Sequence, residues 1–480
     1  MLAALCLGVL LVGVELFITA VALPDIFFDL SGWSELRPAS WVVTAYLVAY
    51  IAAMPLAGRA ADRFGLPGLM IVALIVFAIG SVACGAASSL EMLIFGRVIQ
   101  GAGAGAIRPV ATAGASHLYE GHARSRALGL IGAATFLGMA IGPLLGALIL
   151  EHLQLRDALV SSGIWSGPLV ELFTPAWRWV FYVTAPLAIL AAIYVWAAEP
   201  GWDVEPGSSR LDGVGAALFS VSLTAGLLAI TLVGDETVDL PVIPIGVVIA
   251  VVGGTLAVRH MLRTPEPFLD LRLFADRVFS GAVLVSLLTG YALATAIVGM
   301  AVFIDRVRFA GPEEQGVVLG PMALFMAIGA FLSGFLMRRF DATSVTLVGL
   351  AASVIGLLWL SYTRLETELW MPVASLSLFG LGFGLTVTPR SMAAVESAGR
   401  DAFGAASAAV TVARMAGMAL GMAVLTAFGT TTIDRTTRAL EEQEYRDAIL
   451  PPELVGRPLG DPLVLNAIEL WASTEAAMVL

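Results

Sequence analysis

Long runs of apolar residues recur along the whole chain, separated by short polar stretches that contain glycine, proline or arginine. A helix needs about 20 mostly apolar residues to cross a bilayer, and by this measure the pattern predicts about fourteen transmembrane helices. They lie near 2–23, 40–60, 66–88, 92–117, 126–150, 177–198, 212–233, 239–262, 277–304, 315–336, 342–362, 370–391, 404–428 and 464–480. The last run carries Asn466, Glu469 and Glu475, and we expect the chain to end part-way through this helix. The sequence therefore predicts an all-α, polytopic membrane protein.

The composition agrees with a chain that lies in a bilayer. Hydrophobic residues make up 59% of the 480 residues, charged residues make up 13%, and the mean hydropathy is +0.91. Soluble domains average about 45–50% apolar and about 25% charged residues. The net charge of -11 does not indicate a nucleic-acid partner. Cys6 and Cys84 both fall in apolar runs, so a disulfide framework is not expected.

Arginines set the expected orientation, because the chain contains no lysine. If the N-terminus lies in the cytoplasm, the inner connections hold Arg59, Arg63, Arg124, Arg126, Arg210, Arg259, Arg263, Arg272, Arg277, Arg338, Arg339, Arg390 and Arg400. The short outer connections then hold only Arg37, Arg306, Arg308 and Arg364. Two longer outer loops, 151–178 and 429–463, hold further arginines, but long loops count less in the positive-inside rule. We therefore expect a cytoplasmic N-terminus.

One acidic residue interrupts the first apolar run, in the stretch VELFITAVALP. This residue, Glu15, lies at a depth from the outer face similar to that of Arg97 in the fourth run. An unpaired ion at such a depth costs about 2.5–3.5 kcal/mol on insertion scales, so a Glu15–Arg97 pair is expected. Ions inside a membrane usually mark a pathway, which favours a proton or substrate site. A purely structural ion pair is the alternative.

Two further arginines fall inside predicted spans without a local counter-ion. Arg108 precedes Pro109 toward the cytoplasmic side, where it could extend to the interface or attract an anionic headgroup or drug. Arg414 lies near the middle of its span, which makes such an extension harder. For Arg414 we favour a role in gating or coupling over a static hydrogen-bonding role, and both residues are candidates for a central cavity.

The chain also repeats itself. The second span ends in PLAGRAADRFG and the tenth in FLSGFLMRRFDA, while GMAIGPLLG in the fifth matches GMALGMAVL in the thirteenth. Repeated halves are typical of secondary transporters. The offset of eight spans predicts two six-helix bundles, residues 1–200 and 266–480, with two inserted linker helices in residues 201–265.

Three short stretches resemble conserved motifs of the major facilitator superfamily. The turn GRAADRFG resembles motif A, with Gly58, Asp62, Arg63 and Gly65. The segment RVIQGAG resembles motif B, with Arg97, Gln100 and Gly101. The segment GMAIGPLLG resembles motif C, which marks the antiporters of the family, with Gly138, Gly142, Pro143 and Gly146. The motif B glycines sit inside a span, so they indicate close helix packing and not a dinucleotide loop.

The resemblance to motif A implies a cytoplasmic clamp between the two halves. Asp62 would face the N-terminus of the helix that starts near Gly404, where the helix dipole favours negative charge. The chain departs from the motif after Gly65, where LPG replaces the usual basic pair. The clamp is therefore weaker, or it is completed by Arg390 or Arg400.

The likeness extends to one branch of the family. VELFITAVALPDI is similar to the first-helix signature of the fourteen-span drug:proton antiporters, and both WVVTAYLVAYIAAMPLAGRAADRFG and ASAAVTVARMAGM are similar to the mycobacterial triacylglycerol exporters. Two departures stand out. Phe136 occupies a position that is acidic in those exporters, across from the arginine matched by Arg414, and the loop at 363–369 is short.

This resemblance implies a proton-driven exporter of lipophilic compounds, which are drugs, cationic amphiphiles or lipids. It implies a monomer in the bacterial cytoplasmic membrane that uses the proton motive force and no cofactor, with Glu15 as the proton carrier. A glycerolipid exporter that works with an envelope lipoprotein is the alternative. An integral-membrane enzyme is disfavoured, because the histidines show no metal-binding spacing.

Overall fold

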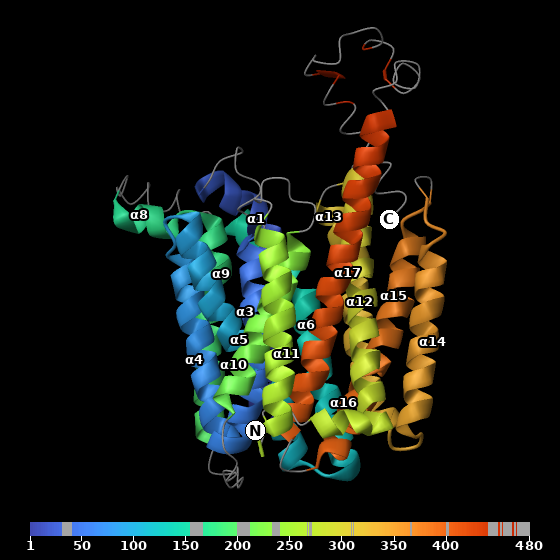
Figure 1. The fold of residues 1–480 in the computed structure, drawn as a ribbon. Helices are drawn as coiled ribbons and strands as arrows, with labels where there is room; N and C mark the ends of the chain where they lie inside the picture. Colours follow the sequence, from blue (N-terminus) through green and yellow to red (C-terminus); the bar gives the residue numbers. More distant parts are fainter. Residues whose placement is uncertain are drawn as a thin grey trace.

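The computed structural model describes residues 1–30, 41–153, 167–198, 212–232, 241–265, 271–308, 312–364, 367–399 and 403–439, with a few isolated positions outside these ranges. Within them the regular structure is helical, with no strand. Eleven of the described helices are long and apolar enough to cross a membrane. Figure 1 shows most of them running side by side, while the short helix α8 lies across the end of the bundle opposite the N-terminus.

The first part of the chain forms the helices α1 (Leu2–Leu30), α3 (Trp41–Phe64), α4 (Leu66–Gly85), α5 (Leu90–Leu118), α6 (Gly121–His152), α8 (Pro168–Phe173) and α9 (Ala176–Ala198). The middle forms α10 (Gly213–Thr231) and α11 (Val242–Arg263). The last part forms the 3-10 helix η2 (Leu271–Ala275), α12 (Arg277–Arg306), α13 (Pro312–Leu336), α14 (Ala342–Leu360), α15 (Trp370–Leu385), α16 (Val387–Ala398) and α17 (Phe403–Ala439).

Helix packing groups the two ends of the chain and joins them. In the first part α1 packs along α6, and α5 packs against both α3 and α4. In the last part α12 packs along α17, and α15 packs against α13 and α14. The two parts meet where α6 contacts α13 and where α3 contacts α17. The middle helices α10 and α11 pack on each other, and α10 also contacts α3 and α17.

Aspartates begin three helices that start at the same end of the bundle. Asp212 accepts a 2.8 Å hydrogen bond from the backbone of Gly215 at the start of α10. Asp276 and Asp341 cap α12 and α14 in the same way. Aspartate is among the preferred residues at this position because its oxygen satisfies a free N–H group and complements the helix dipole. These caps fix where each span begins after a polar connection.

Glycines let α5 approach its neighbours closely. A side chain at Gly101 would collide with the carbonyl of Tyr46, and one at Gly105 with the carbonyl of Tyr50, both on α3. Small residues permit such backbone contact in membranes, where lipid offers no hydrophobic force between helices. The glycine-rich stretch of α5 is thus a packing surface, and it brings both tyrosines against the helix that carries Arg97 and Arg108.

The predicted span 370–391 is two helices that break at Thr386. Its hydroxyl donates a 2.7 Å hydrogen bond to the carbonyl of Phe383, a contact that commonly bends helices. Pro389 lacks the backbone N–H that would continue the hydrogen-bond ladder. Beyond the break, α16 continues to Ala398, and its Arg390 is buried inside the protein.

Most predicted spans coincide with helices of the structure. The segment 464–480 lies almost wholly outside the described residues, so the count of fourteen and the division at 200 and 265 stay predictions. Helix α8 was not predicted, since it is short and falls within the outer loop 151–178.

Candidate functional site

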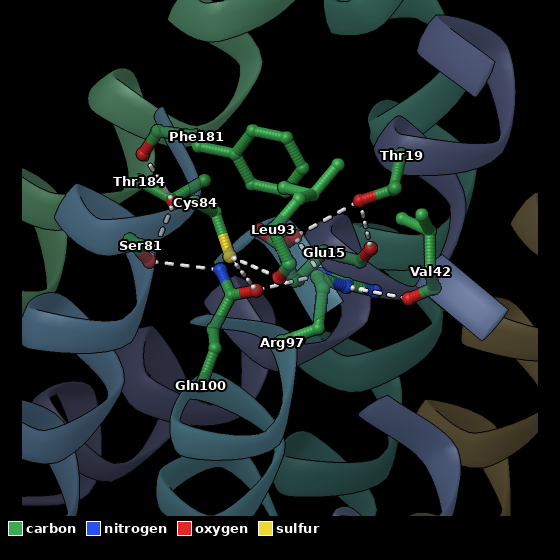
Figure 2. A network of polar contacts seen from close by, with 10 residues as sticks. All are labelled: Glu15, Thr19, Val42, Ser81, Cys84, Leu93, Arg97, Gln100, Phe181 and Thr184. Atoms are coloured by element: carbon green, nitrogen blue, oxygen red, sulfur yellow. Dashed lines mark hydrogen bonds and ion pairs between the residues drawn. The ribbon is translucent and has the colours of Figure 1, made fainter. Parts of the chain in front are cut away.

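A carboxylate and a guanidinium meet inside the first group of helices (Figure 2). Glu15 on α1 and Arg97 on α5 are 0% and 1% exposed, and Arg97 Nη1 donates a 2.6 Å hydrogen bond to Glu15 Oε1. Thr19, one turn further along α1, donates a 3.0 Å hydrogen bond to the same oxygen. The other oxygen, Oε2, has no partner among the described residues. The two charges therefore neutralise each other while one carboxylate oxygen stays unoccupied.

Arg97 is held by more groups than Glu15 is. Its Nη1 also donates a 2.6 Å hydrogen bond to Gln100 Oε1, and its Nε donates one of 3.0 Å to the carbonyl of Val42. The guanidinium carbon lies 4.1 Å from the centre of the Tyr46 ring, which allows a cation–π contact. Arg97 would thus keep acceptors if the carboxylate lost its charge.

Gln100 extends the ion pair into a wider polar network. Its Nε2 donates a 2.8 Å hydrogen bond to Ser81 Oγ on α4, and Thr184 on α9 donates a 3.1 Å hydrogen bond to the same hydroxyl. Groups from α1, α3 and α5 contact the guanidinium of Arg97, and groups from α4 and α9 extend the network through Gln100 (Figure 2). If Glu15 takes up a proton, the guanidinium of Arg97 therefore keeps neutral hydrogen-bond acceptors.

Three more arginines line a small cavity. Arg108 on α5, Arg390 on α16 and Arg414 on α17 are 8%, 4% and 3% exposed. The volume of the cavity that the centre of a water molecule can reach is about 20 Å³. The cavity therefore holds about one water. Its other walls are Thr112, Leu128, Ile131, Gly132, Val387, Ser391, Ser407, Val410 and Thr411. Because α5 and α6 belong to the first part of the chain and α16 and α17 to the last, the cavity lies between the two groups of helices.

Arg390 was not predicted as a member of this group. The prediction that it belongs to a cytoplasmic connection is wrong, because the structure buries it. Arg390 is buried, lines the cavity and donates a 2.6 Å hydrogen bond to Thr289 on α12. The signal in the sequence is Pro389, one residue earlier, because a proline inside an apolar span predicts an irregular helix, and the structure has a break nearby at Thr386.

A larger, apolar hollow of about 420 Å³ lies on the other face of α17. Ala408, Ala409, Val412, Ala413 and Ala416 face it from α17, and Phe219, Leu223, Val258, Met261, Leu271, Phe274 and Val283 are among its other walls. Helix α17 thus has a polar face that carries Arg414 and an alanine-rich face toward α10, α11 and α12.

The structure places only part of motif A. Gly58 is buried near the end of α3, and Gly65 joins α3 to α4 with a φ of 86°, a conformation that favours glycine. The side chains of Asp62 and Arg63 lie outside the described part of the chain, so their position relative to the start of α17 is not described. The cytoplasmic clamp therefore stays a prediction.

The motif C glycines seat α6 on the helix that carries Glu15. A side chain at Gly138 would collide with the carbonyl of Leu10, and one at Gly142 would lie 2.6 Å from the carbonyl of Val14. Gly146 approaches Ile18 in the same register, and Pro143 lies within α6. Motif C thus packs α6 against the residues on either side of Glu15.

Comparison with known proteins places the chain in a family. Residues 5–422 match the Major Facilitator Superfamily, and the chain belongs to this family of transporters. A triacylglyceride transporter of Mycolicibacterium hassiacum is 33% identical over 499 residues, a match that covers 99% of this chain and 86% of that protein. Multidrug resistance protein 3 of Bacillus subtilis is 28% identical over 444 residues, covering 91% of this chain and 80% of that protein. The resemblance read from the motifs is confirmed.

Solved structures agree with the fold. An inward-facing, occupied bacterial homologue of the human lysosomal transporter Spinster matches with a TM-score of 0.59 and 19% identity, covering 100% of this chain and 92% of the other. The proton:xylose symporter bound to a glucose derivative matches with a TM-score of 0.57 and 14% identity, covering 99% and 94%. At such identities the likeness concerns the fold alone.

Proposed function

We propose that this transporter is a proton-coupled exporter of lipophilic compounds that works by alternating access. It would act as a monomer in the bacterial cytoplasmic membrane with its N-terminus inside, and residues 1–200 and 266–480 would form the two moving halves. The observation that carries the proposal is the fully buried Glu15–Arg97 pair, because ionisable groups inside a membrane usually mark a transport pathway.

Glu15 would carry the proton. In the state described here its charge is neutralised by Arg97. Protonation from the outer side would weaken that bond while Arg97 keeps Gln100 and the carbonyl of Val42 as acceptors. The loosened contact between α1 and α5 would let the halves change their exposure, and release of the proton inside would restore the pair.

The available energy suits this role. One proton that crosses a potential of 100 mV supplies about 2.3 kcal/mol, and a tenfold proton gradient adds about 1.4 kcal/mol. The sum of about 3.7 kcal/mol corresponds to a solute concentration ratio of roughly 500. One proton per cycle is therefore enough to expel a lipophilic solute against a useful gradient.

The test compares Glu15→Gln with wild type in proteoliposomes with an imposed pH gradient. We expect the variant to lose the acceleration by the gradient, because its side chain cannot exchange a proton. Glu314→Gln is the matched control, since it removes a carboxylate from a partly exposed ion pair with Arg308. Transport by Glu15→Gln that still follows the pH gradient would reject Glu15 as the proton carrier.

A second candidate is a glycerolipid exporter that works with an envelope lipoprotein. The names of the mycobacterial relatives favour it. Phe136, which replaces an acidic residue of that branch, packs edge-on against Phe383 with ring centres 5.6 Å apart, so an aromatic contact occupies the position. Deletion of the gene should then alter envelope glycerolipids, whereas under the first proposal it should alter drug tolerance.

A further inference from the structure

Arg108, Arg390 and Arg414 converge on the cavity between α5, α6, α16 and α17 with most of their hydrogen-bonding capacity unused. Neither Arg108 nor Arg414 donates a side-chain hydrogen bond to any residue that the structure describes, and Nε of both Arg390 and Arg414 is buried without a partner. A buried guanidinium without acceptors is strongly unfavourable. Hydroxyl groups line the cavity, but apart from the bond from Arg390 to Thr289 no described group accepts a side-chain hydrogen bond from the three arginines.

The cavity also lacks negative charge. Within the described ranges the ion pairs of arginine join Arg97, Arg178 and Arg308 to carboxylates, and none involves the three cavity arginines. The three positive charges repel one another instead. A counter-charge is missing among the described side chains that line the cavity.

We propose that this cavity is a binding site for an anionic amphiphile, whose carboxylate or phosphate is held by Arg108, Arg390 and Arg414. Guanidinium groups bind such oxyanions through paired, charge-assisted hydrogen bonds. The hydroxyl of Tyr50, on the neighbouring helix α3, is also buried without a described partner. A cationic substrate would meet repulsion at the same place.

An amphiphile fits better than a free anion because hydrocarbon surface surrounds the charges. Leu128, Ile131, Val387 and Val410 line the same cavity as the arginines. The apolar hollow of about 420 Å³ lies on the opposite face of α17, and this volume is within the range of small-molecule pockets. In the present state the cavity admits about one water, so the halves must separate before a headgroup enters.

This inference rests on the proposed export of lipophilic compounds, and it adds that the exported compound is negatively charged. Its test is equilibrium binding to the purified protein in nanodiscs of phosphatidylcholine, without a proton gradient. The anionic lipid palmitoyl lysophosphatidic acid is compared with two compounds that have hydrocarbon chains of similar length. Palmitoyl monoacylglycerol is uncharged, and hexadecyltrimethylammonium is positively charged. Inorganic phosphate is added as a competitor. We expect the anionic lipid to bind at least tenfold more tightly than the other two.

Variants separate the site from general lipid binding. Arg414→Gln should weaken binding of the anionic lipid more than tenfold and leave the affinity for the neutral lipid unchanged. Arg414→Lys should retain most of the preference for the anionic lipid over the neutral one. Arg259→Gln is the matched control, because Arg259 is exposed on α11. A thermal melt gives an independent readout. Without ligand Arg414→Gln should melt higher than wild type, since it removes an uncompensated buried charge.

The outcomes are distinct from those of the Glu15 experiment. Equal binding of the three lipids, or an equal loss in Arg414→Gln and Arg259→Gln, would overturn the anionic site while Glu15-dependent transport could still stand. Displacement of the lipid by millimolar inorganic phosphate would show that the site binds free anions. It would also overturn the proposal that the ligand is an amphiphile. An anionic preference with transport that ignores Glu15 would support the site and reject the proposed proton carrier.

Discussion

The two partners of the buried ion pair are unequally supported, and this asymmetry predicts unequal effects of their removal. Arg97 is the cation that pairs with Glu15. Arg97 itself also donates hydrogen bonds to Gln100 and to the carbonyl of Val42, and it lies over the ring of Tyr46. Removal of one partner of a buried pair typically costs about 3–5 kcal/mol, because the other charge stays buried and unpaired. Arg97→Gln should destabilise the protein by about that amount. Glu15→Gln should cost clearly less.

Unfolding of both single variants and of the double variant in mixed micelles measures this difference as a double-mutant cycle. We expect the double variant to be less destabilised than the sum of the two single variants, since no unpaired charge remains in it. Equal costs for the two single variants, with additive effects, would show that the network around Arg97 gives no support when the carboxylate is neutral.

At the scale of helices, α6 and α13 form a tight contact at the end of the bundle where α6 begins and α13 ends. Ser125 Oγ donates a 3.1 Å hydrogen bond to the carbonyl of Gly334, and a side chain at Gly334 would lie 2.7 Å from the carbonyl of Ser125. At the same end the ring of Phe403 lies 5.0 Å from the guanidinium of Arg124. Under the proposed orientation, with the N-terminus in the cytoplasm, this is the inner end, and the two groups of helices are in contact there.

Gly334→Trp should therefore prevent inner closure and arrest the transporter open to the cytoplasm. The large ring cannot fit between the backbones of α6 and α13, so we expect transport to fall at least tenfold while the protein stays folded. Gly320→Trp on the same helix is the control, since open space surrounds that glycine. Transport assays with both variants, together with labelling of a cysteine introduced at Ser391, give the readout. Unchanged labelling in Gly334→Trp would contradict the arrest.

Most helices could be predicted from the sequence, because the thickness of the bilayer fixes the minimum length of a spanning helix and each spanning helix appears as an apolar run of that length. The fourth and fifth spans, predicted at 92–117 and 126–150, are found as Leu90–Leu118 and Gly121–His152. The extra turns are polar segments that hydropathy does not count, such as the stretch that begins α6. The break at Thr386 and the short helix α8 depend on single hydrogen bonds and local packing, which a hydropathy pattern does not contain.

The candidate site was predictable only in part, for the same reason. Glu15 and Arg97 stand out because a charge within an apolar run requires a partner, and equal depth indicated which one. The grouping of Arg108 with Arg414 and Arg390 depends on how α5, α16 and α17 meet around one cavity. The spacing of these residues along the chain does not show that the three helices meet, so the arginine cluster could be identified only from the structure.

Across the whole molecule, α5 and α3 join the ion pair to the arginine cavity. Arg97 and Arg108 are on the same helix, about 16 Å apart along its axis. On α3 the rings of Tyr46 and Tyr50 stack with centres 5.9 Å apart. Tyr46 covers Arg97, and the backbone of Tyr50 packs on Gly105, three residues before Arg108. A displacement of α3 and α5 that follows entry of a ligand between the halves would therefore also change the surroundings of Glu15.

This connection predicts that binding of ligand changes the proton occupancy of the carrier. Coupling between two sites is reciprocal, so a ligand whose affinity falls tenfold on protonation of Glu15 lowers the proton affinity of Glu15 by the same factor, or about 1.4 kcal/mol. Addition of palmitoyl lysophosphatidic acid to purified protein in weak buffer should then release protons, which a pH-sensitive dye detects. Glu15→Gln should bind the lipid without release. Equal proton release from wild type and Glu15→Gln would place the exchangeable proton on another group and separate the two sites, whatever the lipid affinity.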